Sequence, residues 1–137
     1  MFETSLYLLG GLPAFLLYFA SGIILLLLFV AIYTKITPHD ELALIRANNT
    51  AAALALGGAI IGFALPMASA ISHSVTLLDC VLWGLVALII QALTFVVLRM
   101  MVSELPKRIT NGEMAPAIFT AATAIAVGLI NAACMTY

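Results

Sequence analysis

The sequence predicts an all-α integral membrane protein, a single domain with four transmembrane helices. Its 137 residues are 65% hydrophobic and only 8% charged, and their mean hydropathy is +1.24. An apolar run of about 20 residues crosses a hydrocarbon core of roughly 30 Å as a helix. Four runs of this kind occur, at residues 13–34, 50–71, 80–98 and 114–135.

The first run, 13–34, is predicted to be a permanent span rather than a cleaved signal peptide. Residues 1–3 are acidic and contain no lysine or arginine, whereas a signal peptide begins with a basic region. The apolar core of the run is also longer than that of a signal peptide.

The even and odd runs differ in side-chain size. Alanine and glycine dominate the second and fourth runs, whereas bulky residues make up the first and third. Small residues at three- and four-residue spacing let helix backbones approach closely in lipid. We therefore expect the even helices to pack inside and the odd helices to face lipid. The predicted packing residues are Ala51, Ala55, Gly58 or Ala59, Gly62, Ala117, Ala121, Ala124 and Gly128.

The connection between the first two runs predicts a helix that begins before the membrane. Thr37 is a favourable N-cap, and Asp40 follows where the helix dipole favours acids. We expect about three turns at the membrane interface, with Leu42 on the apolar side and Glu41 on a polar side. A metal or proton site at His39, Asp40 and Glu41 is the alternative, although consecutive helical residues point in different directions.

A similar signal precedes the third run. Thr76 and Asp79 repeat the cap spacing of the first connection, so we expect them to cap the third helix. His73 lies in the same short loop and is expected to be a solvated histidine.

Basic residues predict the orientation. All five lysines and arginines lie in two connections, 35–49 and 99–113. Basic loops are retained in the cytoplasm, so both termini are predicted to be periplasmic. The chain has no basic cluster large enough to indicate nucleic-acid binding.

The two halves of the chain predict a duplicated two-helix unit, 13–71 and 79–137. A shift of 66 residues aligns Gly62 with Gly128, and it places a long basic loop at the same point of each half. Units of two spans share one orientation, so an axis along the membrane normal would relate them.

The runs ITPHDELALIRANNTAAALALGGAIIGFALPMASAI and AVGLINAACMTY resemble the YjfL-like family of small bacterial inner-membrane proteins, a family of unknown function. The resemblance extends from about residue 36 to residue 137. It implies a four-span protein of the bacterial inner membrane and brings no catalytic residue or cofactor. It also suggests a role in envelope maintenance, with membrane partners in envelope stress.

Three residues within the spans provide or expose a polar group. Gln91 and Asn131 are polar, and Pro66 cannot donate a hydrogen bond to the carbonyl of Gly62. Contacts between neighbouring helices are the first interpretation, and the lining of a path for an ion or small solute is the second. The spans contain no deep ionisable residue, which argues against a proton-coupled pump.

The two cysteines are predicted to lie near the same periplasmic surface. Cys80 begins the third run and Cys134 ends the fourth, in a compartment that permits disulfides. A bridge requires Cα atoms roughly 4.4–6.8 Å apart, whereas packed helix axes lie about 8–10 Å apart. Buried free thiols are therefore the default expectation, and a Cys80–Cys134 disulfide is the alternative.

Two classes of function follow. The sequence has no catalytic triad, phosphate loop or metal-spaced cluster, so neither an enzyme nor a cofactor is expected. The first class is a structural or accessory membrane module, expected to contact lipids and to form a homo-oligomer. The second is a small oligomeric pore or uncoupled carrier.

Overall fold

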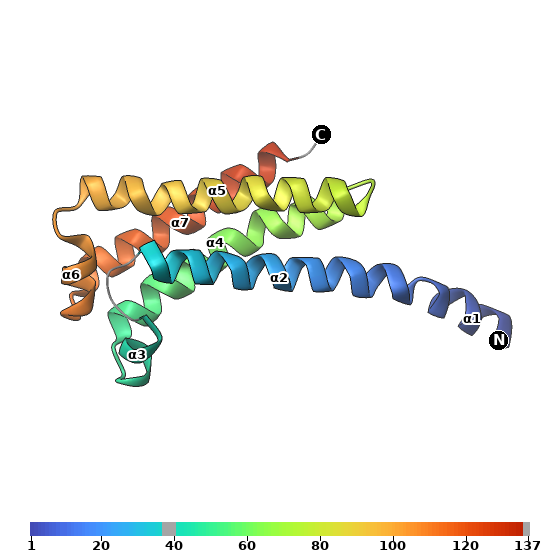
Figure 1. The fold of residues 1–137 in the computed structure, drawn as a ribbon, viewed down its shortest axis with the longest axis horizontal. Helices are drawn as coiled ribbons and strands as arrows, with labels where there is room; N and C mark the ends of the chain where they lie inside the picture. The colour runs from blue at the N-terminus through green and yellow to red at the C-terminus, as the bar shows by residue number, and fades with distance from the viewer. Residues whose placement is uncertain (37–40, 136–137) are drawn as a thin grey trace.

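The computed structural model describes residues 1–36 and 41–135, which form seven α-helices. They are α1 (Phe2–Gly10), α2 (Leu12–Ile36), α3 (Glu41–Arg46), α4 (Thr50–His73), α5 (Leu77–Met101), α6 (Leu105–Thr110) and α7 (Met114–Cys134). The four long helices run alternately in opposite directions, and the short α3 and α6 lie at one end (Figure 1).

Four candidate spans confirm the predicted fold class. They cover Phe2–Ile36, Thr50–His73, Leu77–Met101 and Met114–Cys134, and each is long and apolar enough to cross a membrane. The last three differ from the predicted runs by less than one helical turn at each end. The first is longer than predicted, because α1 precedes α2 with a single residue between them.

Helix α1 was not predicted from the sequence. Together with α2 it makes a candidate span of 35 residues. At 1.5 Å per residue this is about 50 Å, well beyond a hydrocarbon core of roughly 30 Å. All residues of α1 are exposed, and the helix extends past the end of the bundle (Figure 1).

The core is centred on the contact between α4 and α7, which is the most extensive helix contact. Helix α4 is the most buried span and α2 the least. The small-residue helices α4 and α7 pack on each other as predicted, whereas α5 buries as large a share of its apolar window as α7 does. The cause is the outward face of α7, where Ile118, Phe119, Leu129 and Ile130 are exposed.

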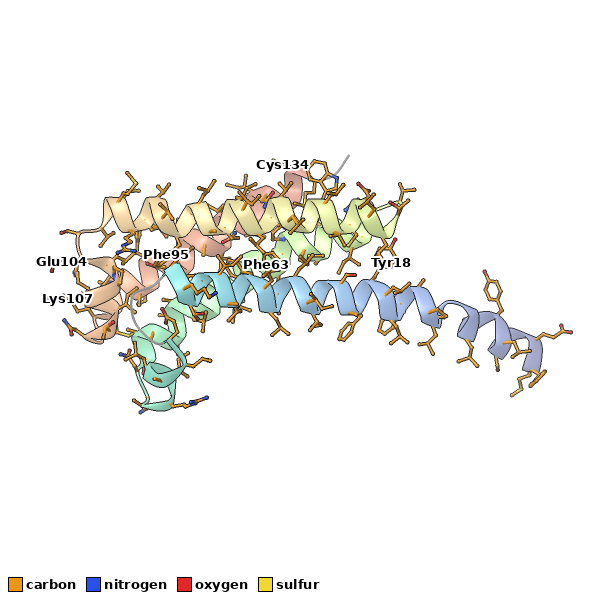
Figure 2. The ribbon with its side chains drawn as sticks, in the orientation of Figure 1. Tyr18, Phe63, Phe95, Glu104, Lys107 and Cys134 are labelled. Carbon is orange, nitrogen blue, oxygen red and sulfur yellow. The ribbon has the colours of Figure 1, made fainter. Side chains whose placement is uncertain are left out.

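Aromatic contacts attach the second half of α2 to the core. Phe29 stacks on Phe63 of α4 with ring centroids 5.0 Å apart. Tyr33 meets Phe95 of α5 edge to face at 4.9 Å. The first half of α2 has no such attachment among the described residues, and Phe15 and Phe19 are exposed there. Figure 2 shows Phe63 and Phe95 within the bundle.

The first connection differs from its prediction. Helix α3 ends at Arg46, the chain turns at Asn48 with a φ of 67°, and Asn49 caps α4 by accepting from the Ala52 amide at 3.0 Å. The expected three-turn helix is therefore interrupted. Thr37 and Asp40 lie outside the described residues.

Two residues of α3 are placed opposite to the expectation, whereas Leu44 and Ile45 pack against the core as expected. Glu41 is only 1% exposed, whereas Leu42 is 50% exposed. Glu41 lies near Tyr33 of α2, close enough to interact with it electrostatically. The burial of Glu41 depends on tertiary packing, and the apolar pattern within the segment does not reveal it.

The second cap has the expected partners. The Thr76 hydroxyl accepts from the Asp79 amide at 3.2 Å, and the Asp79 carboxylate accepts from the Val75 amide at 3.3 Å. The Thr76 hydroxyl satisfies an amide in the first turn of α5, and the Asp79 carboxylate satisfies the amide of Val75, the residue before the cap.

The basic residues gather at the end of the bundle that carries α3 and α6. Lys35 and Arg99 lie in the last turns of α2 and α5, and Arg46 ends α3. Lys107 and Arg108 are in α6. The N-terminus and the end of α7 lie toward the opposite end (Figure 1), and Figure 2 shows Lys107 and Cys134 far apart along the bundle.

The element order repeats from one half to the other. Helices of 25, 6 and 24 residues are followed by helices of 25, 6 and 21 residues. Gly62 and Gly128, which the 66-residue shift aligns, contact each other where α4 crosses α7. A pair of repeats related by a twofold axis would give this geometry, and the duplication stays a prediction.

Candidate functional site

The amide of Gln91 is a buried polar group within the membrane-spanning helices. This side chain is 2% exposed on α5. Its Nε2 donates to the carbonyl of Gly62 on α4 at 2.9 Å and to that of Ala124 on α7 at 3.2 Å. One amide therefore holds three membrane-spanning helices together.

The Gly62 carbonyl is available to Gln91 because of Pro66. In a regular helix the amide of residue 66 would donate to this carbonyl, and proline has no N–H. Pro66 is buried within α4, so water does not replace the lost donor. A side chain from α5 thus satisfies the acceptor that a proline in α4 leaves free.

The close approach of α4 and α7 surrounds this hydrogen bond. A Cβ added at Gly62 would lie 2.8 Å from the carbonyl carbon of Ala124, and one added at Gly128 would lie 2.8 Å from the Cα of Gly62. A Cβ added at Gly58 would meet Ala121. The remaining predicted packing residues, Ala51, Ala55, Ala59, Ala117 and Ala124, are buried as well.

A small, partly enclosed cavity adjoins Gln91. About 10 Å³ of it is open to the centre of a water molecule, and its lining includes Tyr33, Gln91, Thr94 and Thr120. Thr94 donates to the carbonyl of Ile90 in its own helix at 2.8 Å. The hydroxyl of Thr120, which is 1% exposed, has no hydrogen-bond partner among the described residues.

The three candidate lining residues are not gathered around one space. Gln91 lines this cavity, whereas Pro66 and Asn131 are absent from its lining. Asn131 follows Ala124 on α7 by two turns, about 10 Å along the axis. It is buried, and its Nδ2 has no hydrogen-bond partner within the described parts of the chain.

Sequence reasoning missed Thr94 and Thr120. Thr120 lies on the small-residue face of α7, three residues after Ala117 and four before Ala124. A hydroxyl on a face predicted to be buried is the signal that could have identified it. Thr94 offered no comparable signal, because its position depends on the rotation of α5.

A second feature lies at the basic end of the bundle. A groove of about 630 Å³ separates the connection before α4 from the connection before α7. Asn49 crosses between them and donates from Nδ2 to the carbonyl of Thr110 at 2.9 Å. The groove is open and lined largely by exposed residues such as Asn48 and Asn111.

A metal site and a disulfide are the remaining candidates. Residues 1–36 and 41–135 contain no group of three or more His, Cys, Asp or Glu side chains that could hold a metal ion. His39 and Asp40 lie outside the described residues. Cys80 and Cys134 are free thiols, the first buried as expected and the second exposed.

These features define a class: a small four-span helical membrane protein in which a buried polar residue joins helices. The chain belongs to the family described as Domain of Unknown Function (DUF350), which matches residues 7–135. It is similar to the "UPF0719 inner membrane protein YjfL" of Escherichia coli K12 and to that of E. coli O157:H7. Each is 42% identical over 132 residues, which cover 96% of this chain and 100% of the relative. No solved structure matches the chain.

Proposed function

We propose that the protein is a non-enzymatic structural or accessory module of the bacterial inner membrane. Its closed helical core would present an outer surface to lipids and partner proteins. The hydrogen bonds from Gln91 to Gly62 and Ala124 carry this proposal. They use both N–H groups of the amide to hold helices, which leaves neither for a passing solute.

The cavity beside Gln91 supports the same proposal. It has room for about one water molecule, too little for a continuous water column or a hydrated ion. A pore is thus less well supported within one chain, and it would have to form between protomers.

The outer surface supports contacts with partners. In the first candidate span only 11% of the apolar window is buried inside the bundle, so most of that surface is available to lipid or to protein. We propose that this helix contacts a second copy of the chain or other membrane proteins that maintain the envelope under stress. The inner-membrane names of the relatives support the compartment.

A flux measurement tests the closed core. Proteoliposomes with the purified protein should release potassium and small uncharged solutes no faster than protein-free vesicles do. Flux that is present with the wild type and abolished by Gln91→Leu would overturn the proposal in favour of the pore.

Photo-crosslinking in intact membranes tests the contacts. A crosslinker at Phe19, exposed on α2, should trap a discrete protein adduct. A crosslinker at Leu129, on the exposed face of α7, is the matched control. Mass spectrometry then identifies a second copy or another protein. Lipid adducts alone at Phe19 would contradict the partner contact.

A further inference from the structure

We propose that the cavity between α2, α4, α5 and α7 is a binding site for one water molecule, with Thr120 as its principal partner. The site goes beyond the proposed function, because it concerns a ligand of the core and not the outer surface. It also stands independently, since a pore-forming protein could contain it equally well.

The first argument is the buried hydroxyl of Thr120. Its side chain is 1% exposed and lines the cavity, and its Oγ1 has no hydrogen-bond partner among the described residues. A buried hydroxyl without a partner destabilises the folded protein. A water molecule in the cavity would remove this destabilisation.

The second argument is the size of the cavity and the presence of four polar residues in a lining that is otherwise apolar (Ala59, Phe95, Leu98 and Ala124). A buried water typically makes about three hydrogen bonds to polar groups, and empty cavities are typically apolar. Here Thr94, Gln91 and Tyr33 line the space together with Thr120. Because the Thr94 hydroxyl already donates to Ile90, its oxygen presents lone pairs to a water. About 10 Å³ open to the centre of a water molecule is enough for one water.

The third argument distinguishes water from a cation. The lining contains hydroxyls and one carboxamide but no carboxylate. A bare charge inside a membrane-spanning bundle is costly unless an opposite charge compensates it. A neutral guest that both donates and accepts hydrogen bonds fits this lining better.

The sign of one stability change tests the site. Thr120→Val keeps the shape of the side chain and removes the hydroxyl. If the cavity is dry, the variant loses an unpartnered polar group and its melting temperature rises. If a water bridges Thr120 to its neighbours, the variant loses those hydrogen bonds, and we expect the melting temperature in lipid nanodiscs to fall by several degrees.

The matched control is Thr123→Val on the same helix. Thr123 lines an open groove between α5 and α7, so its hydroxyl is not part of the proposed site. Its melting temperature should match that of the wild type. A rise in melting temperature for Thr120→Val against an unchanged Thr123→Val would overturn the proposal.

A direct measurement keeps the proposal testable if Thr120→Val fails to fold. In NMR spectra of wild-type protein with labelled threonine methyls, a magnetisation-transfer peak should connect the Thr120 methyl with water. Ala59→Val, which fills the cavity from α4, should abolish that peak. Absence of this peak in the wild type would overturn the proposal. Sodium or potassium chloride that raises the melting temperature of the wild type but not of Thr120→Val would also overturn it, because the site would then bind a cation.

Discussion

Two adjacent glycines in α4 have opposite surroundings. A Cβ added at Gly58 would strike Ala121 of α7, whereas a Cβ added at Gly57 meets nothing within 4 Å. We expect Gly58→Ala to destabilise the protein by about 1–3 kcal/mol, the usual cost of overpacking. Gly57→Ala should be neutral or slightly stabilising, because alanine favours the helix. Thermal unfolding in nanodiscs compares the two, and equal melting temperatures would contradict the close packing of α4 on α7.

The hydrogen bond between Gln91 and Gly62 makes a second residue-level prediction. Gln91→Leu leaves the buried Gly62 carbonyl without this donor and should cost about 1–3 kcal/mol. In a Pro66→Ala background the cost should be smaller, because the amide of residue 66 can then donate to Gly62.

A double-mutant cycle measures this coupling from the free energies of unfolding. Independent sites add to within about 0.3–0.5 kcal/mol. Additivity of Gln91→Leu and Pro66→Ala within that margin would show that the two residues do not share the Gly62 carbonyl.

At the scale of elements, α1 is separable from the bundle. All its residues are exposed, and it lies beyond the end of the bundle (Figure 1). Deleting Phe2–Gly10 should therefore leave the melting temperature unchanged. Phe29→Ala provides the contrast, because Phe29 is 1% exposed and stacks on Phe63, and its loss should cost about 3–5 kcal/mol. A large drop on deletion of α1 would show that it stabilises the fold.

Sequence reasoning predicted the helices whose position depends on local properties of the sequence, such as the length of an apolar run. Apolar length alone determined the four long helices, to within a turn at most ends. Helix α1 was missed because the predicted first run began only at residue 13. The break at Asn48 and the cap at Asn49 could have been recognised, since asparagine favours both positions.

The candidate site could be predicted from the sequence only in part, for a different reason. Gln91 and Pro66 were each singled out, but nothing in their spacing shows that both act on the carbonyl of Gly62. That pairing depends on how α5 is rotated against α4. The burial of Glu41 and the cavity beside Thr120 likewise depend on contacts with other helices.

For the whole molecule, the distribution of charge along the bundle predicts its orientation. All five basic residues lie at the end with α3 and α6, and the N-terminus and the end of α7 lie toward the other end. The basic end is expected to face the cytoplasm. Cys134, exposed in the last turn of α7, would then lie on the periplasmic side, whereas the buried Cys80 would be protected.

Thiol labelling tests this orientation. A membrane-impermeant maleimide should modify Cys134 in cells with a permeabilised outer membrane and an intact inner membrane. In a Cys134→Ser background, a cysteine introduced by Ser103→Cys, in the exposed connection between α5 and α6, should react only after the inner membrane is broken. The reverse pattern at the two positions would place the termini in the cytoplasm.

The same reagent decides the state of the two thiols. Both cysteines are free in the structure, so denatured protein should react at two positions without prior reduction. Native protein should react at Cys134 alone, because burial shields Cys80, and Cys80→Ser should leave that native signal unchanged. Two thiols that become reactive only after reduction would instead show a disulfide. A non-reducing gel would then distinguish a bridge within one chain from a bridge between two copies.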